Sequence, residues 1–176
     1  MSDTRGRILD ALEDVLAEFG HGGATLEAVA ARAGVSKGGL LYHFGTKEAL
    51  YSGLLDRLRG LGEADADVVE GAPIVDSYLA TSSVAAYEFT RSLMAALRLV
   101  GVPGIDAAGA IVAALDPWSR VLTREISDPL VARLITLVGD GLYLRALLGA
   151  TPDPMDAELA PYLEALILAR DPDRQD

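Results

Sequence analysis

Residues 25–50 read TLEAVAARAGVSKGGLLYHFGTKEAL, and this stretch decides the fold prediction. Thr25 is typical of an N-cap, and a short amphipathic helix follows it from Leu26. Gly34 suits the left-handed backbone conformation that ends a helix, and Ser36 suits the cap of a second short helix. Two short helices joined by a turn of three to four residues that contains glycine form a helix-turn-helix.

The sequence on either side continues the helical pattern. From Thr4 to Phe19 apolar residues recur at the spacing of one helical face, and glycines follow directly. Thr46 predicts the cap of a further helix, which fades into the glycine-rich, acidic residues 60–67. Because such stretches commonly separate domains, we expect a boundary there, with one domain at 1–60 and another at 61–176.

Beyond Pro73 every convincing segment is helical, and no strand pattern of useful length occurs. The Asp-Pro pairs at 116–117 and 128–129 predict two helix starts, with proline at the first helical position. The two last helices, at about 128–149 and 156–170, are strongly apolar, and the first of them is apolar on every side. A helix of that kind is buried on all sides, so we expect a partner chain to pack against these two helices. The predicted fold class is all-α, with about nine helices.

The charge of the chain is unevenly distributed. Overall, 15 lysines and arginines stand against 26 acidic residues, a net charge of −11 that argues against a nucleic-acid partner. Residues 1–60 carry seven bases and eight acids, whereas 61–176 carry eight bases and eighteen acids. Residues 28–47 contain three bases, Arg32, Lys37 and Lys47, and no acid. The sequence therefore predicts a local basic surface on the helix-turn-helix.

Several functional classes lack their residues. Cysteine is absent, which removes disulfides and thiolate chemistry, and the two histidines, His21 and His43, both fall in the N-terminal segment. We find no phosphate loop, dinucleotide fingerprint or metal-ligand spacing, so we expect no enzyme, no cofactor and no metal. The longest apolar run, 107–115, is about half of the roughly 20 residues that cross a bilayer. With no secretory signal pattern, a cytoplasmic protein without a membrane segment is expected.

The quoted stretch resembles the helix-turn-helix and the start of the fourth helix of the TetR family of bacterial transcriptional regulators (TetR/AcrR type). The segment 4–19 resembles the family's first helix, so about residues 4–58 carry the likeness. The resemblance implies a DNA-binding domain at 1–60 and an effector-binding and dimerisation domain at 61–176. It implies a homodimeric repressor that binds a palindromic operator and is released by a small molecule. The alternative keeps the helix-turn-helix, while the C-terminal domain only dimerises or binds a protein partner.

The recognition helix is expected at about 36–44. Lys37, at its start, is placed to reach a guanine edge or a phosphate. Gly38 and Gly39 either let the backbone approach the groove closely or are tolerated in a frayed first turn. Leu41 stands where many relatives have tyrosine, which exchanges a hydroxyl for a possible contact with a thymine methyl.

Residues expected to touch phosphates flank this helix. Tyr42 and His43 resemble the family's phosphate-contacting pair, and Thr25 and Lys47 lie at helix N-termini, where free amides favour anions. Arg5 and Arg7 either touch DNA or lie on the surface, while Leu40 and Phe44 are expected in the core. The expected DNA-binding set is Thr25, Ser36, Lys37, Gly38, Gly39, Leu41, Tyr42, His43, Thr46 and Lys47.

The resemblance implies a pocket for an unknown small-molecule effector among the helices between about 73 and 126. Aromatic residues and methionine with a few polar groups are typical of such pockets, and core packing is the alternative for each residue. Trp118, the only tryptophan, is the favoured candidate. The expected effector-binding set is Tyr78, Tyr87, Phe89, Arg91, Met94 and Trp118. The dimer is expected to form through the last two helices, at about 128–149 and 156–170.

Overall fold

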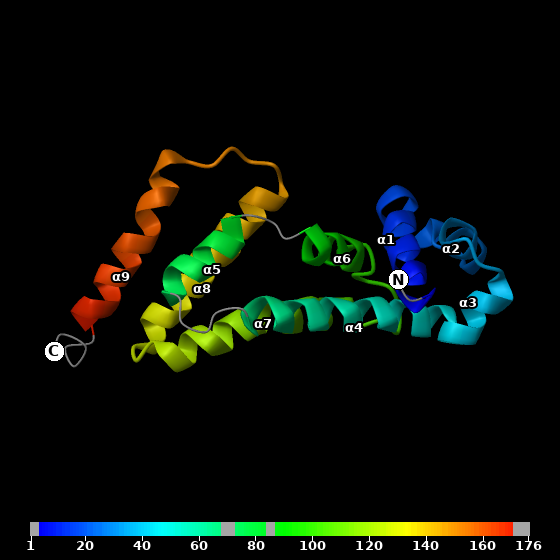
Figure 1. Ribbon diagram of the computed structural model, residues 1–176, viewed down its shortest axis with the longest axis horizontal. Helices are drawn as coiled ribbons and strands as arrows, with labels where there is room; N and C mark the ends of the chain where they lie inside the picture. Colours follow the sequence, from blue (N-terminus) through cyan, green and yellow to red (C-terminus); the bar gives the residue numbers. More distant parts are fainter. Residues whose placement is uncertain (1–3, 68–72, 84–86, 171–176) are drawn as a thin grey trace. The chain divides into compact units, whose positions relative to one another are not determined.

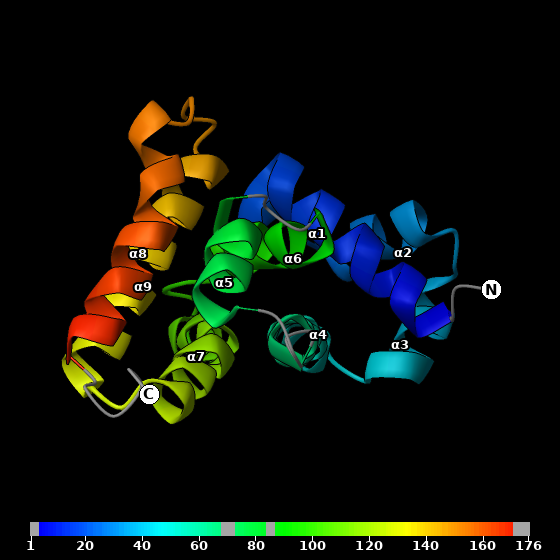
Figure 2. The ribbon, with the colours of Figure 1, turned by 60° about the vertical axis from the view of Figure 1, so that its left-hand side comes forward.

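The computed structural model describes residues 4–67, 73–83 and 87–170, and within these ranges it contains nine α-helices, one 3-10 turn and no strand (Figures 1 and 2). The all-α prediction is therefore confirmed. The helices are α1 (Thr4–Gly23), α2 (Leu26–Ala33), α3 (Lys37–Phe44), α4 (Lys47–Ala66), α5 (Ile74–Ser83), α6 (Tyr87–Leu97), α7 (Ala107–Glu125), α8 (Pro129–Leu147) and α9 (Leu159–Arg170), and the 3-10 turn η2 (Pro154–Glu158) precedes α9.

The helix-turn-helix forms as its local signals predict. The Thr25 hydroxyl accepts a hydrogen bond from the Ala28 amide at 3.1 Å, and the Ser36 hydroxyl accepts one from the Gly39 amide at 3.0 Å. Gly34 ends α2 with φ 68°, a left-handed conformation that glycine adopts without a steric penalty. The caps and the turn thus fix the boundaries of α2 and α3.

Helix α4 continues through most of residues 60–67, where the sequence predicts that it fades. It begins after Thr46, whose hydroxyl accepts from the Ala49 amide at 3.0 Å, and it continues to Ala66. Gly62 lies against α7, where a Cβ on it would stand 2.0 Å from the Ala114 carbonyl oxygen. The glycine therefore permits a close approach of two helices and does not end one.

The prediction of a helix start at Asp116-Pro117 is wrong, because helix α7 runs through this pair. A proline inside a helix removes one backbone hydrogen bond and strains the preceding turn. Pro117 and its neighbour Trp118 are buried, and Leu122 one turn later is fully buried, so packing holds the helix together across the proline. The other predicted start is confirmed, since Asp128 caps α8 and Pro129 is its first residue.

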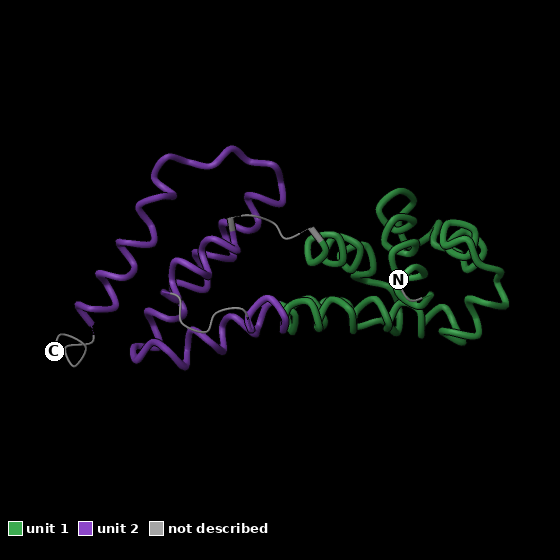
Figure 3. The backbone as a smooth tube through the Cα atoms, viewed as in Figure 1, with its two compact units in different colours: residues 1–62, 88–114 green, residues 63–87, 115–176 purple. Residues whose placement is uncertain are grey.

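The chain divides into two compact units (Figure 3). Unit 1 comprises residues 1–62 and 88–114, so it combines the helix-turn-helix with α6 and the first part of α7. Unit 2 comprises residues 63–87 and 115–176. Its core is formed by α5, α7, α8 and α9, through Val75, Tyr78, Leu79, Trp118, Leu122, Ile126, Val131, Ala132, Ile135, Leu163 and Ile167, with Ala66 from the end of α4.

Helix α8 is apolar around its axis, as predicted, but only one side of it is covered within the single chain. Val131 and Ile135 are buried in the core of unit 2. The opposite side is exposed and carries Leu130, Leu134, Leu137, Leu144 and Leu148.

Candidate nucleic-acid interface

Helix α3 turns one face to the core of unit 1 and the other to solvent. Leu40 and Phe44 are buried, as the sequence predicts. Lys37 and Gly38 are exposed at the N-terminal end, and Tyr42 one turn later is 87% exposed. Leu41 and His43 are half-buried beside this face, and the rings of Tyr42 and His43 meet edge to face at 5.4 Å. An exposed aromatic residue on a short helix is available for contacts outside the chain.

Three helix N-termini in this unit are capped by hydroxyl side chains, those of Thr25, Ser36 and Thr46. Each hydroxyl accepts a hydrogen bond from its helix, which leaves its own hydrogen able to donate. The first amides of a helix have no partner within it, and they carry the positive end of the helix dipole. These N-termini can therefore hold phosphate groups.

The bases of residues 28–47 are less available than their count indicates. Arg32 is paired with Glu18 at 2.5 Å, and Lys37 is paired with Glu27 at 2.6 Å. The hydrogen bond from Lys37 holds the pKa of the Glu27 carboxyl below its ordinary value. Lys47 is the base of this segment for which the described residues provide no carboxylate, and its ammonium lies 5.4 Å from the centre of the Tyr51 ring.

Arg5 has a structural task that the sequence did not reveal. Its guanidinium lies 4.3 Å above the Phe44 ring, and it donates a hydrogen bond to the His43 carbonyl at 3.2 Å. Arg7 donates to the Thr4 hydroxyl at 3.4 Å, within its own helix. Arg5 therefore fastens the end of α3 to α1.

A buried polar cluster joins α1, α4 and α6, and sequence reasoning missed it. Glu13 is 2% exposed, and its carboxylate accepts a hydrogen bond from the Ser92 hydroxyl at 2.5 Å. Arg91 Nε lies 3.1 Å from the same carboxylate, and Arg57 Nη1 lies 3.7 Å from it. Burial raises the pKa of Glu13, while the Ser92 hydrogen bond and the two guanidinium groups oppose this shift. The one available signal was the position of Glu13 at the border of the apolar face of α1, four residues after Leu9 and three before Leu16.

This cluster gives Arg91, expected in an effector pocket, a set of partners on α1. Besides Glu13, its guanidinium donates to the Asp10 carbonyl at 2.6 Å and pairs with Asp14 at 3.0 Å. On the same helix Phe89 is half-buried and Met94 is 40% exposed. The side chain of Tyr87 lies outside the described residues.

The other two expected effector residues lie in the core of unit 2. The rings of Tyr78 and Trp118 are 5.0 Å apart, and both are buried. Trp118 Nε1 donates to Asp65 at 2.6 Å, and the Tyr78 hydroxyl donates to the Thr136 carbonyl at 3.1 Å. Burial raises the pKa of the Tyr78 hydroxyl. Both residues thus have satisfied polar groups within the core.

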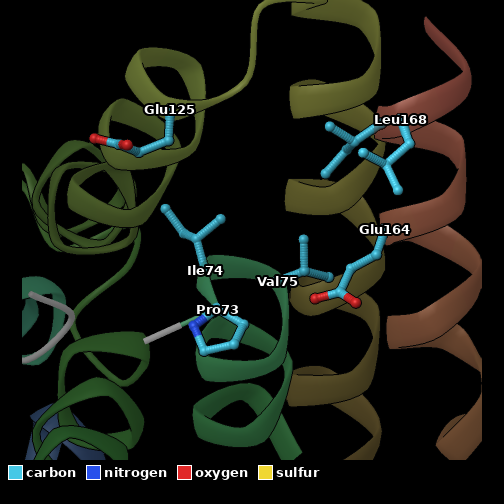
Figure 4. Close-up of a pocket in the computed structure, with 7 residues that line it drawn as sticks. Pro73, Ile74, Val75, Glu125, Glu164 and Leu168 are labelled. Carbon is cyan, nitrogen blue, oxygen red and sulfur yellow. The ribbon is translucent and has the colours of Figure 1, made fainter. Parts of the chain in front are cut away.

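Unit 2 also contains a cavity of about 370 Å³ between the start of α5, the end of α7 and α9 (Figure 4). Its lining combines apolar side chains with two glutamates, and Figure 4 shows the Glu164 side chain directed from α9 toward α5. None of the five expected effector residues with a described side chain lines it; the lining residues are Pro73, Ile74, Val75, Glu125, Glu164, Ile167 and Leu168.

Two kinds of feature, a metal-binding cluster and a membrane-spanning helix, are absent from the described part of the chain. No group of three or more acidic or histidine side chains there could bind a metal ion. None of the helices there combines the length and hydropathy needed to span a bilayer.

The helix-turn-helix can be compared with known proteins. Residues 8–54 match the family model of the bacterial regulatory proteins of the tetR family. Residues 8–54 are therefore similar to the N-terminal domain of this family. The matched segment includes α2, α3 and the buried face of α1, and it contains every expected DNA-binding residue.

A known transcriptional regulator matches a short part of this chain in sequence. The HTH-type transcriptional regulator RutR of Escherichia coli K12 is 45% identical over 58 residues, which are 33% of this chain and 27% of RutR. The match therefore spans about a quarter of that relative.

Solved structures match nearly the whole chain. NalD of Pseudomonas aeruginosa, the secondary repressor of a multidrug efflux pump, gives a TM-score of 0.66 at 19% identity, covering 92% of this chain and 94% of NalD. The multidrug binding protein EbrR, solved with malachite green, gives 0.64 at 24% identity, covering 94% and 98%. Likeness at these identities establishes a shared fold.

Proposed function

We propose that this protein is a DNA-binding transcriptional regulator that inserts α3 into the major groove. The observation that carries the proposal is the outward face of α3, where Lys37, Gly38 and Tyr42 are exposed beside capped helix N-termini. The match of residues 8–54 to the family model and the likeness to the regulator RutR support it. Such a protein works in the cytoplasm, where bacterial DNA lies, and has no catalytic role.

In this proposal the exposed residues divide into base readers and phosphate holders. Lys37 reaches a guanine edge, and Leu41 contacts a thymine methyl. Gly38 lets the backbone approach the groove. A Cβ at this position would meet no atom of the chain closer than 4.0 Å, so packing within the fold does not require a glycine there. Gly39, like Gly38, lets the backbone approach the groove. The phosphate holders are Thr25, Ser36, Tyr42, His43, Thr46 and Lys47.

We propose further that residues 1–60 bind DNA while residues 61–176 dimerise and bind an effector. The exposed leucines at positions 130, 134, 137 and 144 of α8 are separated by four, three and seven residues, which is the spacing of a helix–helix seam. Tyr162 and Leu168 extend the apolar surface onto α9, with 68% and 48% exposed. A homodimer through about 128–149 and 156–170 would cover this surface, and its two-fold axis requires a palindromic operator with half-sites roughly 34 Å apart or a multiple of it.

The effector part of the proposal is repression relieved by a small molecule bound in unit 2. The cavity of about 370 Å³ lies within the range of small-molecule sites, roughly 300–1,000 Å³. EbrR, which shares the fold, was solved with malachite green. Near-complete release of DNA requires the effector to favour one state by about 5.5 kcal/mol.

A second candidate is a regulator whose C-terminal part only dimerises or binds a protein partner. The tight packing of Tyr78 and Trp118, whose polar groups are satisfied inside the core, favours it. A thermal-shift screen of small molecules distinguishes the two, with Val75→Phe as the control that fills the cavity. Compounds that stabilise the original chain and not the variant support an effector site, and a screen without such compounds supports the second candidate.

The DNA-binding proposal is tested by selecting duplexes from a random-sequence library with the purified full chain. We expect enrichment of a palindrome that competes for binding against unselected duplex. If no sequence is enriched over several rounds at low salt, the proposal is wrong.

A further inference from the structure

We propose that Glu27 is a specificity-determining residue. Its carboxylate pairs with Lys37 and weakens binding to random DNA, whereas at the operator Lys37 exchanges the carboxylate for a base edge. This inference rests on the proposed DNA-binding function. Lys37 Nζ lies 2.6 Å from Glu27 Oε1, within hydrogen-bond distance. The pair joins the first residue of α3 to the second residue of α2.

The pair is exposed enough to exchange partners. The side chains of Lys37 and Glu27 are 51% and 65% exposed, and ion pairs in such surroundings are weak because water and salt screen them. An approaching acceptor of favourable geometry can therefore replace the carboxylate. A glutamate carboxylate is already charged at neutral pH, and the Lys37 hydrogen bond lowers the pKa of Glu27 further.

Random DNA and an operator differ in what they offer to Lys37. A phosphate brought to the ammonium also comes close to the Glu27 carboxylate, and the two anions repel each other. At the operator a guanine edge presents two neutral acceptors, O6 and N7, inside the groove. Exchange of Glu27 for a guanine edge avoids part of this repulsion, so the pair reduces random binding more than operator binding.

The effect of Glu27 is large relative to the positive charge that is left. Arg32 faces two carboxylates on α1, those of Glu18 and Asp14, and its side chain is less exposed than that of Lys37, so it is less available as a phosphate contact. Lys47 remains as the base between residues 28 and 47 without a carboxylate partner among the described residues. Release of Lys37 would therefore about double the unpaired positive charge of this segment.

The test compares Glu27→Gln with a matched control, Glu48→Gln. Glu48 is the second residue of α4 after its Thr46 cap, as Glu27 is the second residue of α2 after its Thr25 cap. Glu48 is exposed and forms no ion pair within the described part of the chain. Both variants thus remove one negative charge from an equivalent helical position, and only Glu27→Gln frees Lys37.

Affinities are measured by fluorescence anisotropy on a selected operator and on random duplex over a range of salt. For Glu27→Gln we expect random binding to tighten about three-fold per protomer, in keeping with a weak exposed pair. The salt slope on random duplex should steepen by about one unit per protomer, as one more phosphate contact requires. Operator affinity should change less, so that the ratio of the two affinities falls. Glu48→Gln should leave that ratio closer to that of the original chain.

A double-mutant cycle with Lys37→Gln makes the test specific. In the Lys37→Gln background the effect of Glu27→Gln on random binding should shrink to that of Glu48→Gln, which reports the loss of one negative charge alone. Equal changes for Glu27→Gln and Glu48→Gln in the original chain, or an undiminished effect of Glu27→Gln without Lys37, would overturn the inference while leaving the proposed function intact. If the original chain selects no DNA, the proposed function fails, and the inference fails with it. Circular dichroism melts verify that each variant is folded.

Discussion

Replacing Ser92 by alanine removes one hydrogen bond from the buried Glu13 cluster and little else. Ser92 is fully buried, and its hydroxyl donates to the Glu13 carboxylate at 2.5 Å. Alanine fits the same space and is a better helix former than serine. The free energy of unfolding should therefore report the hydrogen bond. Bonds to charged groups contribute roughly 1.5–3 kcal/mol, so we expect a loss of about 2 kcal/mol at pH 8.

The same substitution should depend on pH. The folded-state pKa of Glu13 is raised above its unfolded value, so the stability linked to this group is present at low pH and is lost as the pH rises through the folded pKa. The Ser92 bond opposes that loss because it lowers the pKa. Below the folded-state pKa, where Glu13 is neutral, the bond is of the neutral kind and the expected loss falls toward about 1 kcal/mol.

The assay is urea unfolding followed by circular dichroism, at one protein concentration, in steps from about pH 5 to pH 8. The control is Ser82→Ala, because Ser82 is also buried and donates at 2.8 Å to a neutral carbonyl, that of Tyr78. Its effect should be about 1 kcal/mol or less and independent of pH. A Ser92→Ala effect that is equally flat across pH would refute the account of a charged buried partner.

Four further outcomes are expected. Lys47→Ala should weaken binding to every DNA sequence and reduce the salt slope by about one unit per protomer; an unchanged slope would remove its phosphate role. Lys37→Ala should weaken operator binding and alter base preference, whereas equal losses on operator and random duplex would show that it reads no base. Gly38→Ala should leave thermal stability unchanged or higher and still weaken DNA binding, unless a frayed turn is all that this glycine reflects. Leu137→Glu should convert a dimer of twice 18.5 kDa to monomer in light scattering, and a persistent dimer would move the interface elsewhere.

The parts of the fold that were predictable from sequence rest on local chemistry. A capping hydroxyl or a left-handed glycine acts on amides within a few residues, so Thr25, Gly34, Ser36 and Thr46 could be read directly. The buried face of α3 followed from helical spacing in the same way. These signals sufficed to locate the helix-turn-helix and its exposed residues.

The errors arose where distant segments meet. Gly62 resembles a helix breaker until α7 lies against it, and Pro117 resembles a helix start until its neighbours are buried. Counting charges in one segment missed that Arg32 and Lys37 are paired with acids outside it. The pairing of Arg91 with α1 was likewise invisible in the local sequence, and its place at an effector site stays a prediction. Tertiary packing decides each of these cases, and local sequence does not encode it.

Footprinting on a selected duplex tests most directly whether two copies of this chain bind DNA through α3. We expect two protected half-sites related by two-fold symmetry, with centres roughly 34 Å or a multiple of it apart. We also expect that Lys37→Ala weakens protection in both halves equally. A single asymmetric footprint, or protection that is unaffected by Lys37→Ala, would contradict this mode of binding.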